Sequence, residues 1–145
     1  MIRRPRVVVL STGDELAQGG LRGAGQVFDA NRPMLLALSQ MAGCEAVDGG
    51  TMPDAVVPLA QRLADLAGTA DLVLTSGGVS LGGRDPIRPA FAMAGGEIAG
   101  WRVAVKPGKP VMFGRIGETA FTGLPGNKYP GLFIFYAVPM QGKTN

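Results

Sequence analysis

Histidine is absent from this chain of 145 residues, and Cys44 is its single cysteine. Without an imidazole, the chain itself cannot form a Ser-His triad, a His-ligated zinc site or a histidine acid–base pair. One cysteine excludes an internal disulfide framework and favours a reduced, cytoplasmic setting. The first hydrophobic run, Val7 to Leu10, is far too short for a signal peptide or a membrane span, so we expect a soluble protein with no membrane partner.

Charge is also sparse and dispersed. Charged residues make up 17% of the chain and hydrophobic residues 46%, a balance that indicates a folded globule rather than a disordered segment. The net charge is +3, and apart from Arg3, Arg4 and Arg6 the basic residues are scattered. A stripe of basic residues with interleaved aromatics is missing, so we expect no nucleic-acid partner, and small anionic ligands suit the pattern better. We interpret residues 1–145 as a single domain.

Glycine, in contrast, is abundant, and two glycine pairs fall in the stretch from Asp71 to Asp85. The apolar run Leu72 to Leu74 is typical of a buried strand of a parallel sheet. Asp85-Pro86 predicts a helix start, because Asp is a good N-cap and Pro is tolerated at the first helical position. Strand, glycine-rich loop and helix start together favour an anion site at the carboxyl edge of a sheet over the alternative, a flexible connector. The loop residues that would approach the ligand are Thr75, Ser76, Gly77, Gly78, Ser80, Gly82 and Gly83.

Strand-like and helix-like segments alternate along the rest of the chain with short connections. This order predicts a three-layer α/β/α sandwich with a mostly parallel central sheet. We expect strands at Arg6–Leu10, Cys44–Val47, Glu97–Val105, Val111–Gly114 and Thr119–Phe121, with a hairpin at 116–118 and a short ladder at Gln26–Phe28. We expect helices that begin with Asn31 or Asp29 as cap, at an Asp54 cap, and at Ile87–Met93. The residues expected in the core are Met34, Met41, Cys44, Phe91, Met93 and the stripe Val57, Ala60, Leu63, Ala64 and Ala67.

Two further groups of charged residues are candidates for binding an anion and a metal ion. In Lys106-Pro107-Gly108-Lys109-Pro110, the stiff backbone allows both ammonium groups to face one anion; the alternative is an ordinary pair of solvated lysines. Four carboxylates fall at strand ends or helix starts, where each alone is a cap or a turn former. Together with the lysines they suggest Mg²⁺ held against phosphate, since Mg²⁺ binds through one or two carboxylates plus substrate oxygens. These acids are Asp14, Asp29, Asp54 and Asp85.

Five motifs occur in an order and at spacings that resemble the molybdopterin-binding domain of the MoeA family. They are STGDEL at 11–16, Asp29-x-Asn31, TSGGVS at 75–80, KPGKP at 106–110 and GLPGN at 123–127. The resemblance runs from about Arg6 to Asn127. It implies the molybdenum cofactor biosynthesis protein fold and an enzyme that, with Mg²⁺, inserts molybdate into adenylylated molybdopterin and releases AMP. It also implies a homo-oligomer, a dimer or a trimer, and a chain without the flanking domains of the family.

The resemblance assigns roles residue by residue. It implies catalytic roles for Asp29, Asp54, Asp85, Lys106 and Lys109, and metal binding by Asp54 and Asp85. It implies that molybdopterin as substrate binds to Thr12, Gly13, Asp14, Thr75, Ser76, Gly77, Gly78, Ser80, Pro107, Gly108, Pro125, Gly126 and Asn127.

Two positions depart from the family pattern. Gly83 stands where the family usually has an acid, and Lys128-Tyr129-Pro130 replaces the usual Pro-Val-Ser. These departures keep open a non-catalytic module that binds pterin or nucleotide or assembles with a partner. A molybdopterin adenylyltransferase is also open, although KPGKP together with GLPGN counts against it. A dinucleotide-binding Rossmann domain is weaker, because no G-x-G-x-x-G follows the first strand.

Overall fold

The computed structural model describes residues 3–17, 20–78, 85–101 and 111–124. Within these residues, no helix combines the length and the apolar character that crossing a membrane requires. The elements along the chain are β1 (Arg6–Thr12), α1 (Asn31–Met41), β2 (Glu45–Met52), α2 (Val56–Leu66), β3 (Leu72–Ser76), α3 (Ile87–Met93), β4 (Glu97–Trp101), β5 (Met112–Ile116) and β6 (Thr119–Leu124).

One mixed sheet organises these elements, in the strand order β2-β1-β3-β6-β5-β4. The four strands β2, β1, β3 and β6 are parallel, and β5 is antiparallel to both of its neighbours. The expected hairpin is confirmed: Ile116 pairs with Thr119, and Gly117 takes a positive φ of 57° in the tight turn between them. The expected ladder at Gln26–Phe28 reduces to a single bridge between Leu16 and Val27.

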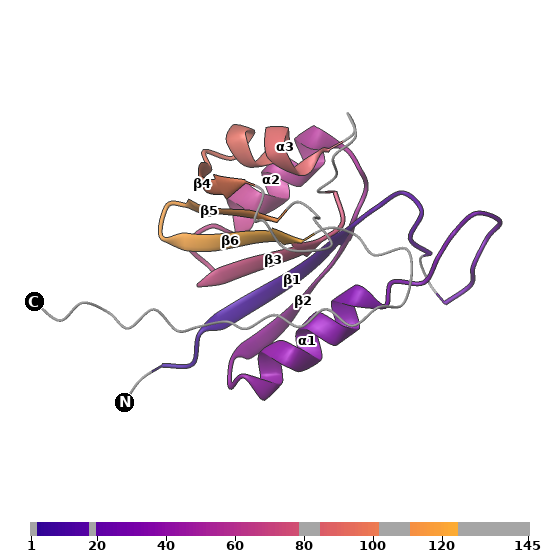
Figure 1. Cartoon of the computed structure of the whole chain (residues 1–145), viewed down its shortest axis with the longest axis horizontal. Coiled ribbons are helices and arrows are strands. Elements are labelled where there is room, and N and C mark those ends of the chain that lie inside the picture. The colour runs from indigo at the N-terminus through magenta and orange to yellow at the C-terminus, as the bar shows by residue number, and fades with distance from the viewer. Residues whose placement is uncertain (1–2, 18–19, 79–84, 102–110, 125–145) are drawn as a thin grey trace, which may run out of the picture.

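The sheet has helices on both faces, which confirms the three-layer sandwich. Figure 1 shows α1 on one face and α2 with α3 on the other. On β1, Val8 and Leu10 join the cluster under α2 and α3, while Val7 and Val9 join the cluster with Leu35 of α1. Successive residues of a strand point to opposite faces, so a strand covered on both sides needs the unbroken apolar run that β1 has.

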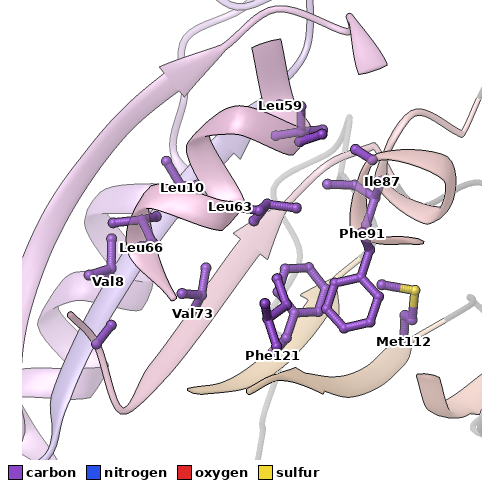
Figure 2. Close-up of a cluster of buried hydrophobic side chains, with 14 residues drawn as sticks. Val8, Leu10, Leu59, Leu63, Leu66, Val73, Ile87, Phe91, Met112 and Phe121 are labelled. Carbon is purple, nitrogen blue, oxygen red and sulfur yellow. The ribbon is translucent and has the colours of Figure 1, made fainter. Parts of the chain in front are cut away.

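The larger core cluster lies between the sheet and the pair α2 and α3 (Figure 2). Phe91 of α3 is fully buried, and its ring centroid lies 4.7 Å from that of Phe121 on β6. Gly114 makes room for this ring, because a Cβ there would come within 2.8 Å of the Phe91 Cζ. The expectation that Phe91 belongs to the core is confirmed, and this cluster ties the helix that begins near Asp85 to the middle of the sheet.

The expected core positions of two methionines are wrong. Met41 and Met93 are 84% and 61% exposed, because they lie on the outer sides of α1 and α3. Met34 and Cys44 are half-buried; Cys44 packs against the α1-side core cluster, but it precedes β2 instead of lying in it.

The inward stripe of α2 differs from the expected one. Ala60 and Leu63 are buried as expected, but Val57 and Ala64 are exposed, and the buried stripe continues through Leu59 and Leu66. The sequence of α2 is apolar around much of its circumference, so the sheet and the neighbouring α3 select the buried side.

Candidate functional site

The predicted ligand-binding residues gather where the parallel strands end. Across the sheet, Ser11 pairs with Ser76, Ser76 pairs with Leu124, and Thr12 pairs with Met52. The loops that leave β1, β2, β3 and β6 therefore start from one edge, the carboxyl edge, where open α/β sheets bind ligands. Thr12, Gly13, Thr75, Ser76, Gly77 and Gly78 all lie at or directly after this edge.

Backbone hydrogen bonds tie each of two loops to the end of a neighbouring strand. The Gly77 N–H donates to the Leu124 carbonyl oxygen at 3.0 Å, and the Gly13 N–H donates to the Met52 carbonyl oxygen at 3.3 Å. Gly77 and Gly78 have φ values of 89° and 69°, and a Cβ at either position would collide with Thr12. Only glycine therefore allows the loop after β3 to pack against the loop after β1.

Buried hydroxyl groups at this edge have no hydrogen-bond partner among the described residues. The oxygens concerned are Ser11 Oγ, Thr12 Oγ1 and Thr75 Oγ1, and Thr75 is fully buried. Thr12 and Thr75 lie on the α3 side of the sheet, because Thr12 follows Leu10 by two residues and Thr75 pairs with Leu10. An unpaired buried hydroxyl costs about 1–3 kcal/mol, so this edge is suited to a ligand that completes the hydrogen bonds.

Asp85 caps α3 as expected, and it uses only one of its two carboxylate oxygens to do so. Its Oδ1 accepts hydrogen bonds from the N–H groups of Ile87 and Arg88 at 3.0 and 3.4 Å, and Pro86 already has helical dihedral angles. Its Oδ2 is buried with no partner in the described part of the chain. Burial raises the pKa of Asp85, although the N–H groups of Arg88 and Ile87 act in the opposite direction. A ligand N–H or a cation bound to Oδ2 would offset the free-energy cost of burying this oxygen.

The expectation that Asp54 caps α2 is wrong. The residue before α2 is Ala55, which is extended and makes no side-chain cap bond. Asp54 instead donates its N–H to Asp14 Oδ1 at 3.0 Å. Partial burial raises the pKa of Asp54, the backbone N–H of Asp14 lowers it, and the charges of Asp14 and Glu15 raise it further. Asp14 and Asp54 thus form a carboxylate pair where β1 and β2 end.

Asp29 is engaged within the protein. Its Oδ1 accepts the Arg32 N–H at 3.1 Å, which confirms it as the cap of α1, and its Oδ2 lies 3.3 Å from the Arg32 Nε. The Arg32 Nη1 also reaches Asp48 Oδ1 at 3.1 Å. Asn31 is the first residue of α1, not its cap. Across the described ranges, no three Asp, Glu, Cys or His side chains come together as a metal-binding group.

The remaining site predictions lie outside the described residues and stay predictions. They concern Ser80, Lys106, Pro107, Gly108, Lys109, Pro125, Gly126 and Asn127, and the departures at Gly83 and at Lys128-Tyr129-Pro130. Ser11 is a residue that the sequence interpretation did not select. The signal was available, because Ser11 is the first hydroxyl after the buried run that ends at Leu10.

Replacing Thr75 with valine should stabilise the protein. The change removes a buried hydroxyl that has no partner among the described residues, so we expect the free energy of unfolding to rise by about 1 kcal/mol. Thr119→Val is the matched control, because the Thr119 Oγ1 accepts from the Gly68 N–H and donates to the Ala70 carbonyl oxygen, both at 2.8 Å. This control should lose about 1–3 kcal/mol. Urea denaturation measures both, and a loss of stability in Thr75→Val would contradict an unpaired hydroxyl.

Comparison with known proteins agrees with this geometry. The sequence matches the family described as "Probable molybdopterin binding domain" over residues 8–137. The molybdopterin molybdenumtransferase of Haemophilus influenzae is 40% identical over 135 residues, which are 92% of this chain and 33% of that protein. The chain thus spans about a third of the length of such curated relatives.

Solved structures share the fold. The molybdopterin biosynthesis moea protein from Pyrococcus horikosii has a TM-score of 0.71 and 29% identity, over 86% of this chain and 30% of that one. The CinA protein of Thermoplasma acidophilum has a TM-score of 0.69 over 85% of this chain and 89% of that one, but at 14% identity it shows the fold alone. The resemblance to the MoeA molybdopterin-binding domain is confirmed, and the chain belongs to the family of probable molybdopterin binding domains.

Proposed function

We propose that this chain acts in molybdenum cofactor biosynthesis, as the domain of an enzyme that inserts molybdate into adenylylated molybdopterin with release of AMP. The observation that carries this proposal is the row of buried polar atoms at the carboxyl edge that have no hydrogen-bond partner within the described ranges. The 40% identity to a molybdopterin molybdenumtransferase supports the same reaction class.

The polar atoms at this edge suit a ligand with two kinds of groups. The hydroxyls of Thr12 and Thr75 can donate hydrogen bonds to anionic oxygens, while the Asp85 Oδ2 can accept one from an N–H group. Adenylylated molybdopterin carries both, phosphate oxygens on one part and ring N–H groups on the other. A ligand held by preformed groups in a site closed to water is oriented for group transfer.

Magnesium is part of the proposal, with Asp54 and Asp85 as the residues that would hold it. Mg²⁺ binds through one or two carboxylates and completes its shell with water or substrate oxygens. Asp54 lies beside Asp14, and Asp85 retains a buried oxygen with no partner in the described segments, so each position fits this mode of binding. When bound, the ion would stabilise the negative charge of the phosphate groups.

Two measurements on the purified chain test the function. Isothermal titration with molybdopterin and with AMP should show binding that Thr12→Val and Thr75→Val each weaken about tenfold, the loss of one or two hydrogen bonds. Thr119→Val, held at a temperature where it is folded, should bind normally, because Thr119 lies at the opposite end of its strand. Incubation with adenylylated molybdopterin, Mg²⁺ and molybdate should release AMP. Equal affinities in all variants would show that the ligand does not bind at the carboxyl edge.

The alternatives have their own outcomes in the same assays. Binding without AMP release would identify a non-catalytic module, which the Gly83 and Pro130 departures make the second candidate. Pyrophosphate release from molybdopterin and ATP would identify an adenylyltransferase. Sedimentation equilibrium of the same sample measures the molar mass and thereby tests the proposed dimer or trimer.

A further inference from the structure

Strand β2 contains an irregularity just before the carboxyl edge. Val9 of β1 pairs with Asp48, whereas the next residue, Leu10, pairs with Gly50. Gly49 is therefore an extra residue in β2, which makes a β-bulge. Asp48 lies on the α1 side, opposite Val9, and Gly50 lies on the α2 side, opposite Leu10. Without a bulge, two residues this far apart in a strand would face the same side.

The bulge decides which face the end of β2 presents to the core. Beyond it, Met52 pairs with Thr12 and packs against the larger core cluster. If β2 continued without the extra residue, every later side chain would change sides, and Met52 would face α1. Asp54 follows Met52 by two residues and donates its N–H to Asp14 Oδ1 at 3.0 Å. The approach of Asp54 to Asp14 therefore depends on the bulge.

Arg32 of α1 contacts this bulge through Asp48. The Arg32 Nη1 donates to Asp48 Oδ1 at 3.1 Å, and the same oxygen accepts the Gly50 N–H at 2.8 Å. The Asp48 side chain thus spans the extra residue, because it starts before Gly49 and bonds the amide after it. The guanidinium holds the oxygen that makes this bond, so α1 and the bulge are fixed relative to each other.

Asp29 in turn holds Arg32. The Arg32 Nε lies 3.3 Å from Asp29 Oδ2, both atoms are buried, and the two side chains are only 21% and 10% exposed. The Arg32 N–H also donates to Asp29 Oδ1 at 3.1 Å. A guanidinium presents several donors in a rigid plane, so one arginine can bond two carboxylates at once in a fixed orientation. Arg32 therefore joins the segment that leaves β1 to the bulge of β2.

We propose that Arg32 is a positioning residue, which bridges Asp29 and Asp48 and so holds the bulge of β2 in the shape that brings Asp54 to Asp14. This inference rests on the proposed function, in which Asp54 holds Mg²⁺. Displacing a group near the reacting atoms by about 1 Å can cost about a hundredfold in rate. The bridge lies on β2, so it acts on the rate more than on the affinity that the hydroxyls of the neighbouring strands provide.

Replacing Asp48 with alanine in the full chain tests the bridge. The change removes the acceptor at the bulge but leaves the buried pair of Arg32 and Asp29 intact. Asp48 is 56% exposed, and exposed ion pairs contribute little to stability, so the variant should stay folded. Hydrogen exchange followed by NMR should show the Asp54 N–H exchanging about tenfold faster. The Gly77 N–H, which bonds to the end of β6 at the same edge, should not change.

Two matched controls separate the bridge from a general loss of charge. Asp48→Asn keeps an oxygen that can accept from both Arg32 and Gly50. Glu97→Ala removes another exposed carboxylate that bonds an arginine, Arg115, but at the opposite edge of the sheet. Both controls should stay within about twofold of the parent in exchange and in AMP release.

Kinetics of AMP release test the positioning role. Asp48→Ala should lower kcat about tenfold, while the molybdopterin affinity from calorimetry stays within about twofold. Arg32→Lys keeps the charge beside Asp29, but a single ammonium cannot hold both carboxylates in the same plane, so kcat should fall to a similar extent. The double variant should be no slower than either single one, because both changes break one bridge. General loss of stability would not separate rate from affinity in this way.

Other results overturn the proposal. Normal exchange at Asp54 in Asp48→Ala would do so whether or not the chain releases AMP. A lower kcat in Arg32→Lys alone would mean that Arg32 contacts the ligand, and an equal loss in Asp48→Asn would mean that the charge of Asp48 acts on it. A parent chain that releases no AMP contradicts the proposed function instead, and exchange at Asp54 then decides the bridge by itself.

Discussion

Replacing Gly77 with alanine should lower the free energy of unfolding by about 3 kcal/mol or more. A residue with a Cβ in the left-handed region loses about 1–2 kcal/mol, and at Gly77 the added carbon would also collide with the Thr12 carbonyl oxygen. A backbone atom cannot rotate away, so the loops after β1 and β3 would have to separate. We therefore also expect loss of ligand binding at the carboxyl edge. Urea denaturation and calorimetric titration measure the two effects.

Gly68→Ala separates backbone strain from the loop contact. Gly68 has a similar φ of 81°, and a Cβ there would meet no atom within 4 Å. This control should lose only about 1–2 kcal/mol and should bind ligand normally. If the two variants lose the same stability, the close approach of Gly77 to Thr12 is not present in solution.

Replacing Phe91 with alanine should remove about 3–5 kcal/mol, among the largest losses available in this chain. The Phe91 ring is fully buried, packs against Phe121 and fills the space that Gly114 leaves open. A cavity there would be bounded by β5 and β6 and could not collapse without moving the sheet. The measurement is the shift in urea midpoint, with the change in slope checked for two-state unfolding.

Met93→Ala is the control from the same helix. The sequence alone assigns both residues to the core, but Met93 is 61% exposed, so its truncation should change stability by less than about 0.5 kcal/mol. A loss at Met93 close to that at Phe91 would mean that α3 is rotated about its axis relative to the structure.

Local features were predictable from the sequence. Asp29 and Asp85 are helix caps because a cap bond joins residues two or three positions apart, and this spacing is visible in the chain itself. The hairpin at Gly117 is of the same kind. The parallel strands were also predictable, since an apolar run such as Val7–Leu10 implies cover on both faces.

Features that depend on contacts between distant segments were not predictable. Helix α2 is apolar on several sides, so the choice of Leu59 and Leu66 over Val57 and Ala64 depends on where the helix meets the sheet and α3. Asp54 has the sequence of a cap, but the loop after β1 brings Asp14 to its N–H.

By itself, the sequence determined the fold class, the caps at Asp29 and Asp85 and the hairpin at Gly117, because each depends on periodicity or on neighbours within a few residues. Only the tertiary structure decided that β6 lies between β3 and β5. It alone left the hydroxyls of Thr12 and Thr75 buried with no partner in the part of the chain that the structure describes. Whether a polar atom is satisfied depends on every segment that packs around it, and the one-dimensional order of residues does not contain that information.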